Sequence, residues 1–368
     1  MRKLSGMLIV YIGGLALLTG CWDEQLLKER SLIKAVGFDG TGVEGEIRET
    51  LSTTVIDNKQ MKELNISVTE KSPRAARNKL ERIVHENLDP SKNRVVLVSQ
   101  DIAKKDIYPV LDIFYRDPIA SLTAKIAITE VAAETIIKKP VPPPLMSGEF
   151  LSNLLENLED NTNIPRENLQ TICPSLLDPI TDFAAPFIKE EGGETIVDGV
   201  ALFNDKKMTG RLDTDETMLY LIMKDKLQKE ATFTIFTKEE QSISDIITIN
   251  VEKANIKKKL EFDKASPVSV SFQVNLKVGV IEYPQDELFE GGKVKDLETI
   301  LSTVLTDKAT TVTTKLQEAK CDGFGIGREI YAFHQKVWKE IDDWKEVYAS
   351  IPITTKVNVE IVNSGIID

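Results

Sequence analysis

The sequence predicts a multidomain protein of mixed α/β and α+β class, with about three domains and mixed sheets covered by packed helices. Its 368 residues exceed what one ordinary core holds, so two or three domains are expected. Strand-like and helix-like runs alternate in the first half, which is typical of an α/β domain. Long alternating strands, two helical runs and a last strand follow in the final third, which predicts an α+β module.

The first half supplies the α/β pattern. Turn residues at 39–42 predict a hairpin, and Ser72 followed by Pro73 is a typical helix start. Asp106 is expected to cap a second helix. The expected strands are 31–38, 47–55, 94–100 and 124–128, and the expected helices are 72–88, 106–114 and 132–138.

A proline-rich stretch from Lys138 to Pro144 separates this domain from the middle of the chain. Four prolines in five residues favour an extended linker or crossover. Residues 147–190 are helix-like but broken by further prolines, and 198–212 predict a hairpin before a helix at 213–224. We therefore expect an N-terminal domain at 21–139, a crossover and middle domain at 140–225, and a C-terminal domain at 226–368.

The final third has the clearest strand pattern. Apolar residues fill every second position over 268–280, which predicts a strand with one buried face and one solvent-exposed face. The apolar face switches near 252–255, which predicts a turn or bulge in the preceding strand. Two helices, 294–316 and 330–348, and a last strand at 353–361 complete the module. Trp338 and Trp344 would lie on the second helix, with Trp344 in the core.

The N-terminus predicts export and lipidation. Arg2 and Lys3 precede a run of twelve apolar residues, Met7–Leu18, which is too short to span a bilayer but fits a signal peptide over residues 1–20. The ending Leu18-Thr19-Gly20-Cys21 resembles a bacterial lipobox. We expect cleavage between Gly20 and Cys21, and S-diacylglyceryl and N-acyl modification of Cys21. The alternative is an ordinary secretory signal with a cysteine nearby by chance.

Charge excludes some partners. The formal net charge is −12, and loss of Arg2 and Lys3 with the signal peptide makes it −14. An acidic surface repels phosphate backbones, so no nucleic-acid partner is expected. Membrane attachment must then be hydrophobic, through the lipid anchor.

No residue pattern predicts catalysis, a cofactor or a metal. The histidines His85 and His334 are isolated, and Cys173 and Cys321 are expected to be free thiols, although one disulfide between them is possible. The glycine-rich stretch Gly323–Gly327 lacks the dinucleotide-binding spacing and follows a helix rather than a strand. We expect it to be a helix-to-helix turn.

Several stretches lie in one order along nearly the whole mature chain: Cys21–Asp23, Leu32–Asp39, Ala76–Asn78, Arg94–Val98, Leu111–Asp112, Arg116–Pro118, Asp198–Phe203, Thr209–Leu212, Asp322–Gly327, Trp338, Trp344 and Gly365. Taken together, they resemble the Ger(x)C family of spore germination lipoproteins.

The resemblance implies a non-enzymatic C subunit of a nutrient germinant receptor, built from three α/β domains. It implies attachment to the outer face of the spore inner membrane and assembly with an A-type and a B-type subunit. Cys21 is the one functional position that transfers. A solute-binding lipoprotein of an importer is the alternative, although the α+β second half argues against two similar lobes. An envelope hydrolase would need a metal or nucleophile constellation.

Overall fold

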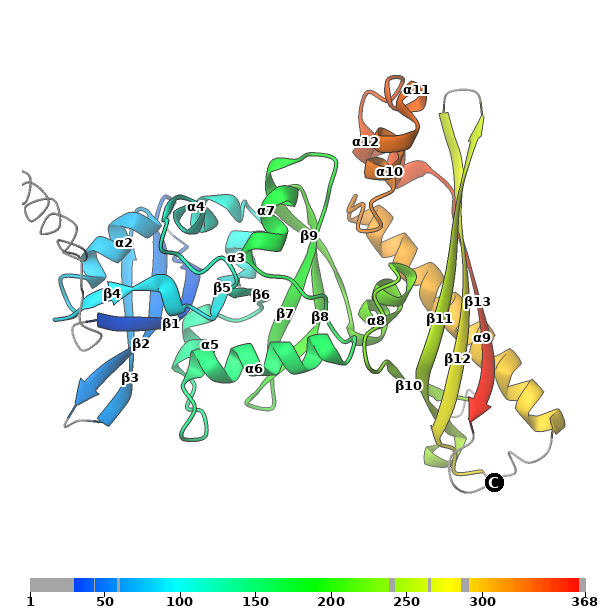
Figure 1. The fold of residues 1–368 in the computed structure, drawn as a ribbon, viewed down its shortest axis with the longest axis horizontal. Coiled ribbons are helices and arrows are strands. Elements are labelled where there is room, and N and C mark those ends of the chain that lie inside the picture. The colour runs from blue at the N-terminus through cyan, green and yellow to red at the C-terminus, as the bar shows by residue number, and fades with distance from the viewer. Residues whose placement is uncertain are drawn as a thin grey trace, which may run out of the picture.

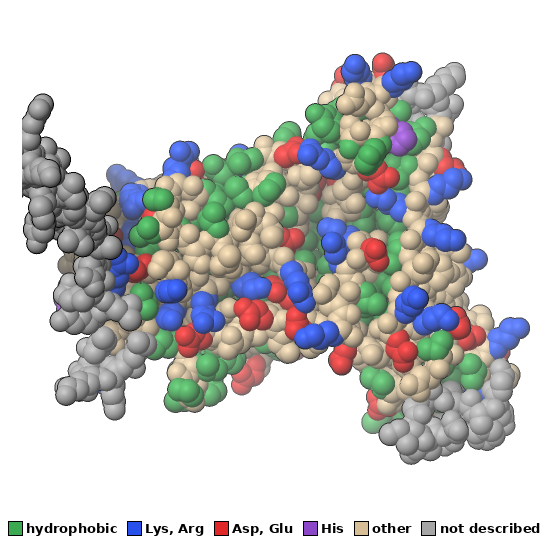
Figure 2. All heavy atoms as spheres, in the orientation of Figure 1, with side chains coloured by type: hydrophobic (Ala, Val, Ile, Leu, Met, Phe, Trp, Pro, Cys, Tyr) green, Lys and Arg blue, Asp and Glu red, His purple; other side chains and the backbone are tan. Residues whose placement is uncertain are grey.

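The computed structural model describes residues 30–42, 44–57, 60–237, 242–263, 266–285 and 291–363. Two sheets, each with its own helices, lie side by side along the long axis of the molecule (Figure 1). The described residues thus confirm a mixed α/β and α+β fold. Basic and acidic side chains are interspersed over the face drawn in Figure 2, and apolar side chains gather above α4 and α7.

The first sheet has nine strands in the order β3-β2-β1-β5-β6-β7-β8-β9, and β4 pairs with β1. The strands of this sheet are β1 (Arg30–Gly40), β2 (Ile47–Asp57), β3 (Gln60–Glu70), β4 (Asn87–Asp89), β5 (Val95–Ser99), β6 (Lys125–Thr129), β7 (Ala184–Glu191), β8 (Glu194–Asn204) and β9 (Lys207–Leu212). The predicted hairpins β1–β2 and β8–β9 are confirmed as antiparallel pairs. Sequence analysis missed β3, which pairs with β2 along its whole length.

Helices cover both faces of the first sheet, as buried parallel strands require. Helices α2 (Pro73–Leu80), α3 (Gln100–Ala103), α4 (Tyr108–Arg116) and α7 (Leu169–Leu177) pack on one face, over Val36 and Val96. Helices α5 (Ala133–Lys138) and α6 (Ser147–Asp160) pack on the other, over Ala35 and Leu97. Successive residues of one strand therefore serve two different cores.

Some predicted helices have different bounds. Ser72 caps α2 as predicted, but the helix ends at Leu80, and Leu88 belongs to β4, where it pairs with Ser31. Strand pairing with β1 therefore decides the structure at Leu88, although the spacing of apolar residues favours a helix there. Asp106 is not the N-cap of α4 that we predicted, because Ile107 takes that position; the Asp106 carboxylate still accepts a hydrogen bond from the Tyr108 amide at the first turn of the helix.

The stretch 147–190 is only partly helical. After α6 and α7 the chain enters β7, which joins β6 in parallel and β8 in antiparallel pairing. Strands from both sides of the expected boundary at residue 140 lie in this one sheet. The division into domains at 139 and 225 remains a prediction.

The second sheet has four strands in the order β10-β11-β12-β13. Its strands are β10 (Thr232–Phe236), β11 (Ile246–Asp263), β12 (Ser266–Glu282) and β13 (Ile353–Asn363). The register shifts between Val251 and Lys253, which confirms the predicted bulge. Helices α8 (Thr214–Met223) and α9 (Gly291–Glu318) contribute to its core beside the alternating valines of β12.

The free edge of β13 is covered by side chains of α9. The amides of Val357, Val359 and Ile361 donate to Thr306 Oγ1, Ser302 Oγ and Glu298 Oε1, at 3.0, 3.0 and 2.9 Å. Residues four apart on a helix rise by about 6 Å, which matches the roughly 6.6 Å between alternate strand residues. The helix thus satisfies backbone groups that an edge strand would otherwise leave open.

The segment 326–350 is not the single helix that we predicted. It forms α10 (Ile326–Phe333), α11 (Gln335–Trp338) and α12 (Trp344–Ser350). Trp338 and Trp344 lie on different helices, and their ring centroids are 6.0 Å apart. Trp344 is 6% exposed, so its predicted place in the core is confirmed.

Candidate functional site at the junction of the two sheets

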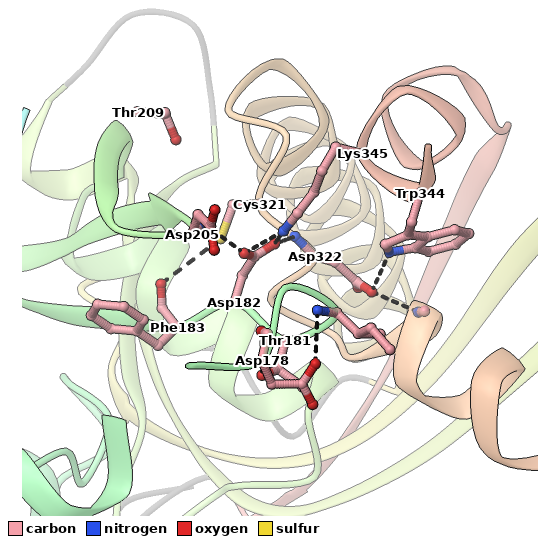
Figure 3. Close-up of polar contacts among 12 residues, drawn as sticks. Asp178, Thr181, Asp182, Phe183, Asp205, Thr209, Cys321, Asp322, Trp344 and Lys345 are labelled. Carbon is pink, nitrogen blue, oxygen red and sulfur yellow. Dashed lines mark hydrogen bonds and ion pairs between the residues drawn. The ribbon is translucent and has the colours of Figure 1, made fainter. Parts of the chain in front are cut away.

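Polar side chains gather where the segment before β7 meets the loop between α9 and α10 (Figure 3). Two buried carboxylates, Asp182 and Asp322, lie at the centre of this group. Buried carboxylates are costly unless every oxygen is paired, so their partners define what the group does.

Asp322 fixes the start of α10 and the position of Trp344. Its Oδ1 accepts from the Ile326 amide at 2.9 Å. Its Oδ2 accepts from the Gly327 amide at 2.6 Å and from the Trp344 indole Nε1 at 3.0 Å. Burial raises the pKa of Asp322, and these three donors oppose that rise. One carboxylate therefore joins two helices that are separate in the sequence.

Asp182 ties the first sheet to the second half of the chain. Its Oδ2 accepts from the Asp322 amide at 2.7 Å, and its Oδ1 accepts from the Asp205 amide at 3.1 Å. The ammonium of Lys345, in α12, forms an ion pair with the same carboxylate, whose side chain has no exposed area. Three segments of the chain converge on this one side chain.

Glycines allow these segments to approach closely. A Cβ on Gly327 would lie 2.3 Å from Trp344 Nε1, and a Cβ on Gly323 would lie 2.8 Å from the Tyr220 hydroxyl oxygen. Gly325 has a φ of 67°, which favours glycine. The predicted helix-to-helix turn is confirmed. Close packing explains Gly323 and Gly327, and the positive φ explains Gly325.

Further contacts extend the junction on both sides. Arg328 forms an ion pair with Asp178 at 2.7 Å, and Thr209 Oγ1 donates to the Ala319 carbonyl at 2.7 Å. The Cys321 thiol points to the Phe183 carbonyl at 3.9 Å. Burial raises the pKa of that thiol well above its usual value, which disfavours the reactive thiolate. The junction holds its groups in fixed pairs, which suits a brace between the sheets.

Other residues that carry the family resemblance also act as structural contacts. The Asp39 carboxylate accepts from the amides of Ala133 at 2.6 Å and Glu134 at 3.0 Å, and so caps α5 from a distant strand. Arg77 pairs with the fully buried Glu49 at 3.1 Å. Both contacts join strands of the first sheet to its covering helices.

The predicted lipidation site, Cys21, and the cleavage point after Gly20 lie outside the described residues. Cys173 and Cys321 are free thiols, as expected. Within the described ranges no group of three or more His, Cys, Asp or Glu residues is placed to hold a metal ion. No helix in the described part of the chain is long and apolar enough to cross a membrane.

Sequence analysis missed Asp182 and Lys345 as partners. They are 163 residues apart, and Asp182 is 140 residues from Asp322. No local spacing could reveal these pairs. The glycine-rich stretch was the one local signal for the junction, because tight approach of two segments requires small residues.

Two family profiles match consecutive parts of the chain. Residues 23–190 match the family described as spore germination protein N-terminal domain. Residues 198–365 match the family described as spore germination B3/GerAC like, C-terminal. Together they cover nearly all of the mature chain that we predicted.

Relatives from Bacillus species cover the chain almost completely. Spore germination protein GerQC of Bacillus cereus is 24% identical over 353 residues, which is 95% of this chain and 96% of the relative. The putative spore germination protein YfkR of Bacillus subtilis (strain 168) is 22% identical over 388 aligned residues, 95% of this chain and 94% of the relative.

The crystal structure of the GerBC protein has a similar fold. Its TM-score is 0.56 at 18% sequence identity, and the match covers 89% of this chain and 97% of that one. This likeness supports the fold described above, and the two family profiles support descent. The chain belongs to the Ger(x)C family of spore germination proteins.

Proposed function

We propose that this protein is the C subunit of a nutrient germinant receptor and acts there without catalysing a reaction. The observation that carries the proposal is the succession of both germination-family profiles over residues 23–190 and 198–365. The arrangement at the junction is compatible with it, because Asp182 and Asp322 are committed to backbone amides, Trp344 and Lys345 rather than open to substrate.

We further propose that Cys21 carries the lipid and that the protein is anchored to the outer face of the spore inner membrane. The lipobox-like ending at Cys21 supports this. The first described strand begins at Arg30, so eight residues lie between the lipidated cysteine and this strand. The nine steps along the chain from Cys21 to Arg30 can span about 30 Å at most. The folded part would then lie close to the membrane surface.

Partner capture tests the proposal. Antibody pull-down from detergent-solubilised spore membranes should recover one A-type and one B-type receptor subunit with this chain. Recovery of importer permease components instead would favour the solute-binding alternative. A strain that carries Cys21→Ala is the control, because its protein lacks the lipid attachment site and shows whether membrane anchoring is needed for the capture.

Germination assays test the role itself. Deletion of the gene should abolish the response to some nutrients and leave germination by calcium dipicolinate intact, since that trigger bypasses nutrient sensing. An unchanged response to every nutrient tested, in a strain without other receptors, would refute the proposal.

A further inference from the structure

A pocket of about 390 Å³ lies between the loop that joins α6 to α7 and the C-terminal end of α8. The first wall belongs to the part of the chain that matches the N-terminal family profile, and the second to the part that matches the C-terminal one. The lining includes Ile164, Arg166 and Glu167 on the first wall and Leu221, Lys224 and Lys226 on the second.

The pocket combines an apolar side with basic side chains. Ile164 and Leu221 are otherwise buried, with 2% and 4% of their surface exposed, and the part that remains exposed faces the pocket. Arg166, Lys224 and Lys226 line the same space. An apolar surface with a few convergent charged groups is typical of a site for a small organic ligand.

Lys224 is the least exposed of the three cations that line the pocket. It is half-buried, and its ammonium donates to the Tyr220 hydroxyl at 3.0 Å. No carboxylate lies within ion-pair distance of Lys224 or of Lys226 among the described residues, whereas Arg166 already pairs with Asp160 at 2.7 Å. Burial lowers the pKa of Lys224, but its interactions with Tyr220 and with the charge of Glu167 more than offset this, so its pKa is raised and its ammonium stays charged at the pocket wall.

The single acid in the lining, Glu167, interacts with the charges of both Lys224 and Lys226. Its carboxylate accepts a hydrogen bond from the Thr171 hydroxyl. Burial raises the pKa of Glu167, so its charged form is disfavoured relative to an exposed glutamate. The balance of charge in the pocket is therefore positive, although the chain as a whole carries −12.

We propose that this pocket binds a small organic carboxylate, whose anionic group lies between Lys224 and Lys226 and whose apolar part contacts Ile164 and Leu221. The assignment is independent of the receptor role. A ligand in this pocket would also be linked to the junction through Tyr220. The Tyr220 hydroxyl accepts a hydrogen bond from Lys224 and donates one to the Gly323 carbonyl at 3.0 Å.

The test is isothermal titration calorimetry of the full-length protein in detergent with sodium hexanoate. Wild type should bind hexanoate, and Lys224→Met should raise the Kd at least tenfold. Lys229→Met is the matched control, since Lys229 is 71% exposed, pairs with Asp160 and does not line the pocket. Its Kd should stay within about twofold of wild type. If Lys224→Met fails to fold, Lys226→Met, at an exposed position, should still raise the Kd at least threefold.

Two further titrations define the class of ligand. Hexylammonium has the same apolar chain with the opposite charge and should not bind, and inorganic phosphate should bind at least tenfold more weakly than hexanoate. Equal binding of hexylammonium would mean apolar adsorption and would overturn the proposal. Phosphate binding as tight as hexanoate, an unchanged Kd in both pocket variants, or no heat with wild type at millimolar hexanoate would overturn it too.

Discussion

Replacing Asp322 by alanine should destabilise the protein more than almost any other single exchange. The side chain is 1% exposed and accepts hydrogen bonds from Ile326, Gly327 and Trp344. Alanine removes all three acceptors at once and leaves a small void. The three donor residues are themselves buried, so water does not readily replace the lost acceptors.

The magnitude follows from the three donors. A buried donor that loses its partner costs about 1–3 kcal/mol, and loss of a helix N-terminal cap costs about 0.5–2 kcal/mol. Burial of the carboxylate, which raises its pKa, offsets part of this, because the variant no longer buries that charge. We expect a loss of about 3–5 kcal/mol in the free energy of unfolding. Asp322→Asn keeps one acceptor oxygen and should lose about 1–3 kcal/mol.

Urea unfolding followed by tryptophan fluorescence measures the effect, since Trp344 donates to the altered carboxylate. Asp342→Ala is the control, because Asp342 is an exposed carboxylate on the same segment. Its free energy of unfolding should change by about 0.5 kcal/mol or less. A loss below about 1 kcal/mol for Asp322→Ala, or equal losses for the alanine and control variants, would refute the reasoning.

Three more exchanges test other parts of the fold and the anchor. Hydrogen bonding to Lys138 lowers the pKa of Glu134 to about 2 from its usual 4.5, so the stabilisation that the ionised Glu134 gives the fold is present above pH 4.5 and is lost as the pH falls towards 2. In Glu134→Gln, the urea concentration at the unfolding midpoint should depend less on pH between 4.5 and 2. The same pH dependence in variant and wild type would contradict this. Gly199 has a φ of 70°, and a Cβ there would lie 2.1 Å from the Leu212 carbonyl oxygen, so Gly199→Ala should lower the free energy of unfolding by at least about 2 kcal/mol. Cys21→Ala should abolish incorporation of labelled palmitate and deplete the protein from the membrane fraction, whereas equal label in wild type and variant would disprove the lipobox interpretation.

Local patterns in the sequence predicted much of the fold. The alternating valines of β12 define a strand with one buried face, and Ser72-Pro73 defines the start of α2. Both signals depend on neighbours within a few residues, so they need no knowledge of tertiary contacts. The bulge in β11 was predicted for the same reason.

Features that depend on distant partners could not be predicted. β3 forms by pairing with β2, and its own sequence, QMKELNISVTE, has mixed polarity. The single helix predicted over 330–348 divides into α10, α11 and α12. The structure places Trp344 on the Asp322 carboxylate and Lys345 on Asp182, and these distant contacts hold α12 against α10. The start of α12 itself is capped locally by the Asp343 side chain, which accepts from the Lys345 and Glu346 amides.

The polar junction between the two sheets also depends on residues that are far apart in the sequence. Its contacts show which residues stabilise the fold and are therefore not free to bind a partner or ligand. Sequence analysis identified the glycine-rich turn but not Asp182, whose partners come from three other segments. Three residues that carry the family resemblance, Asp39, Arg77 and Asp322, hold elements of the fold together. They identify the fold and leave the chemistry of recognition to other surfaces.

The edge of the second sheet at β13 is poorly suited to bind a partner by strand addition. A partner that adds a strand to a sheet needs free backbone amides at its edge. On β13 the amides of Val357, Val359 and Ile361 are already taken by side chains of α9. A partner strand would have to displace three hydrogen bonds, each worth about 0.5–1.5 kcal/mol net, before forming its own. A partner that binds along this side of the protein should therefore contact side chains of α9 and the sheet faces rather than add a strand to β13.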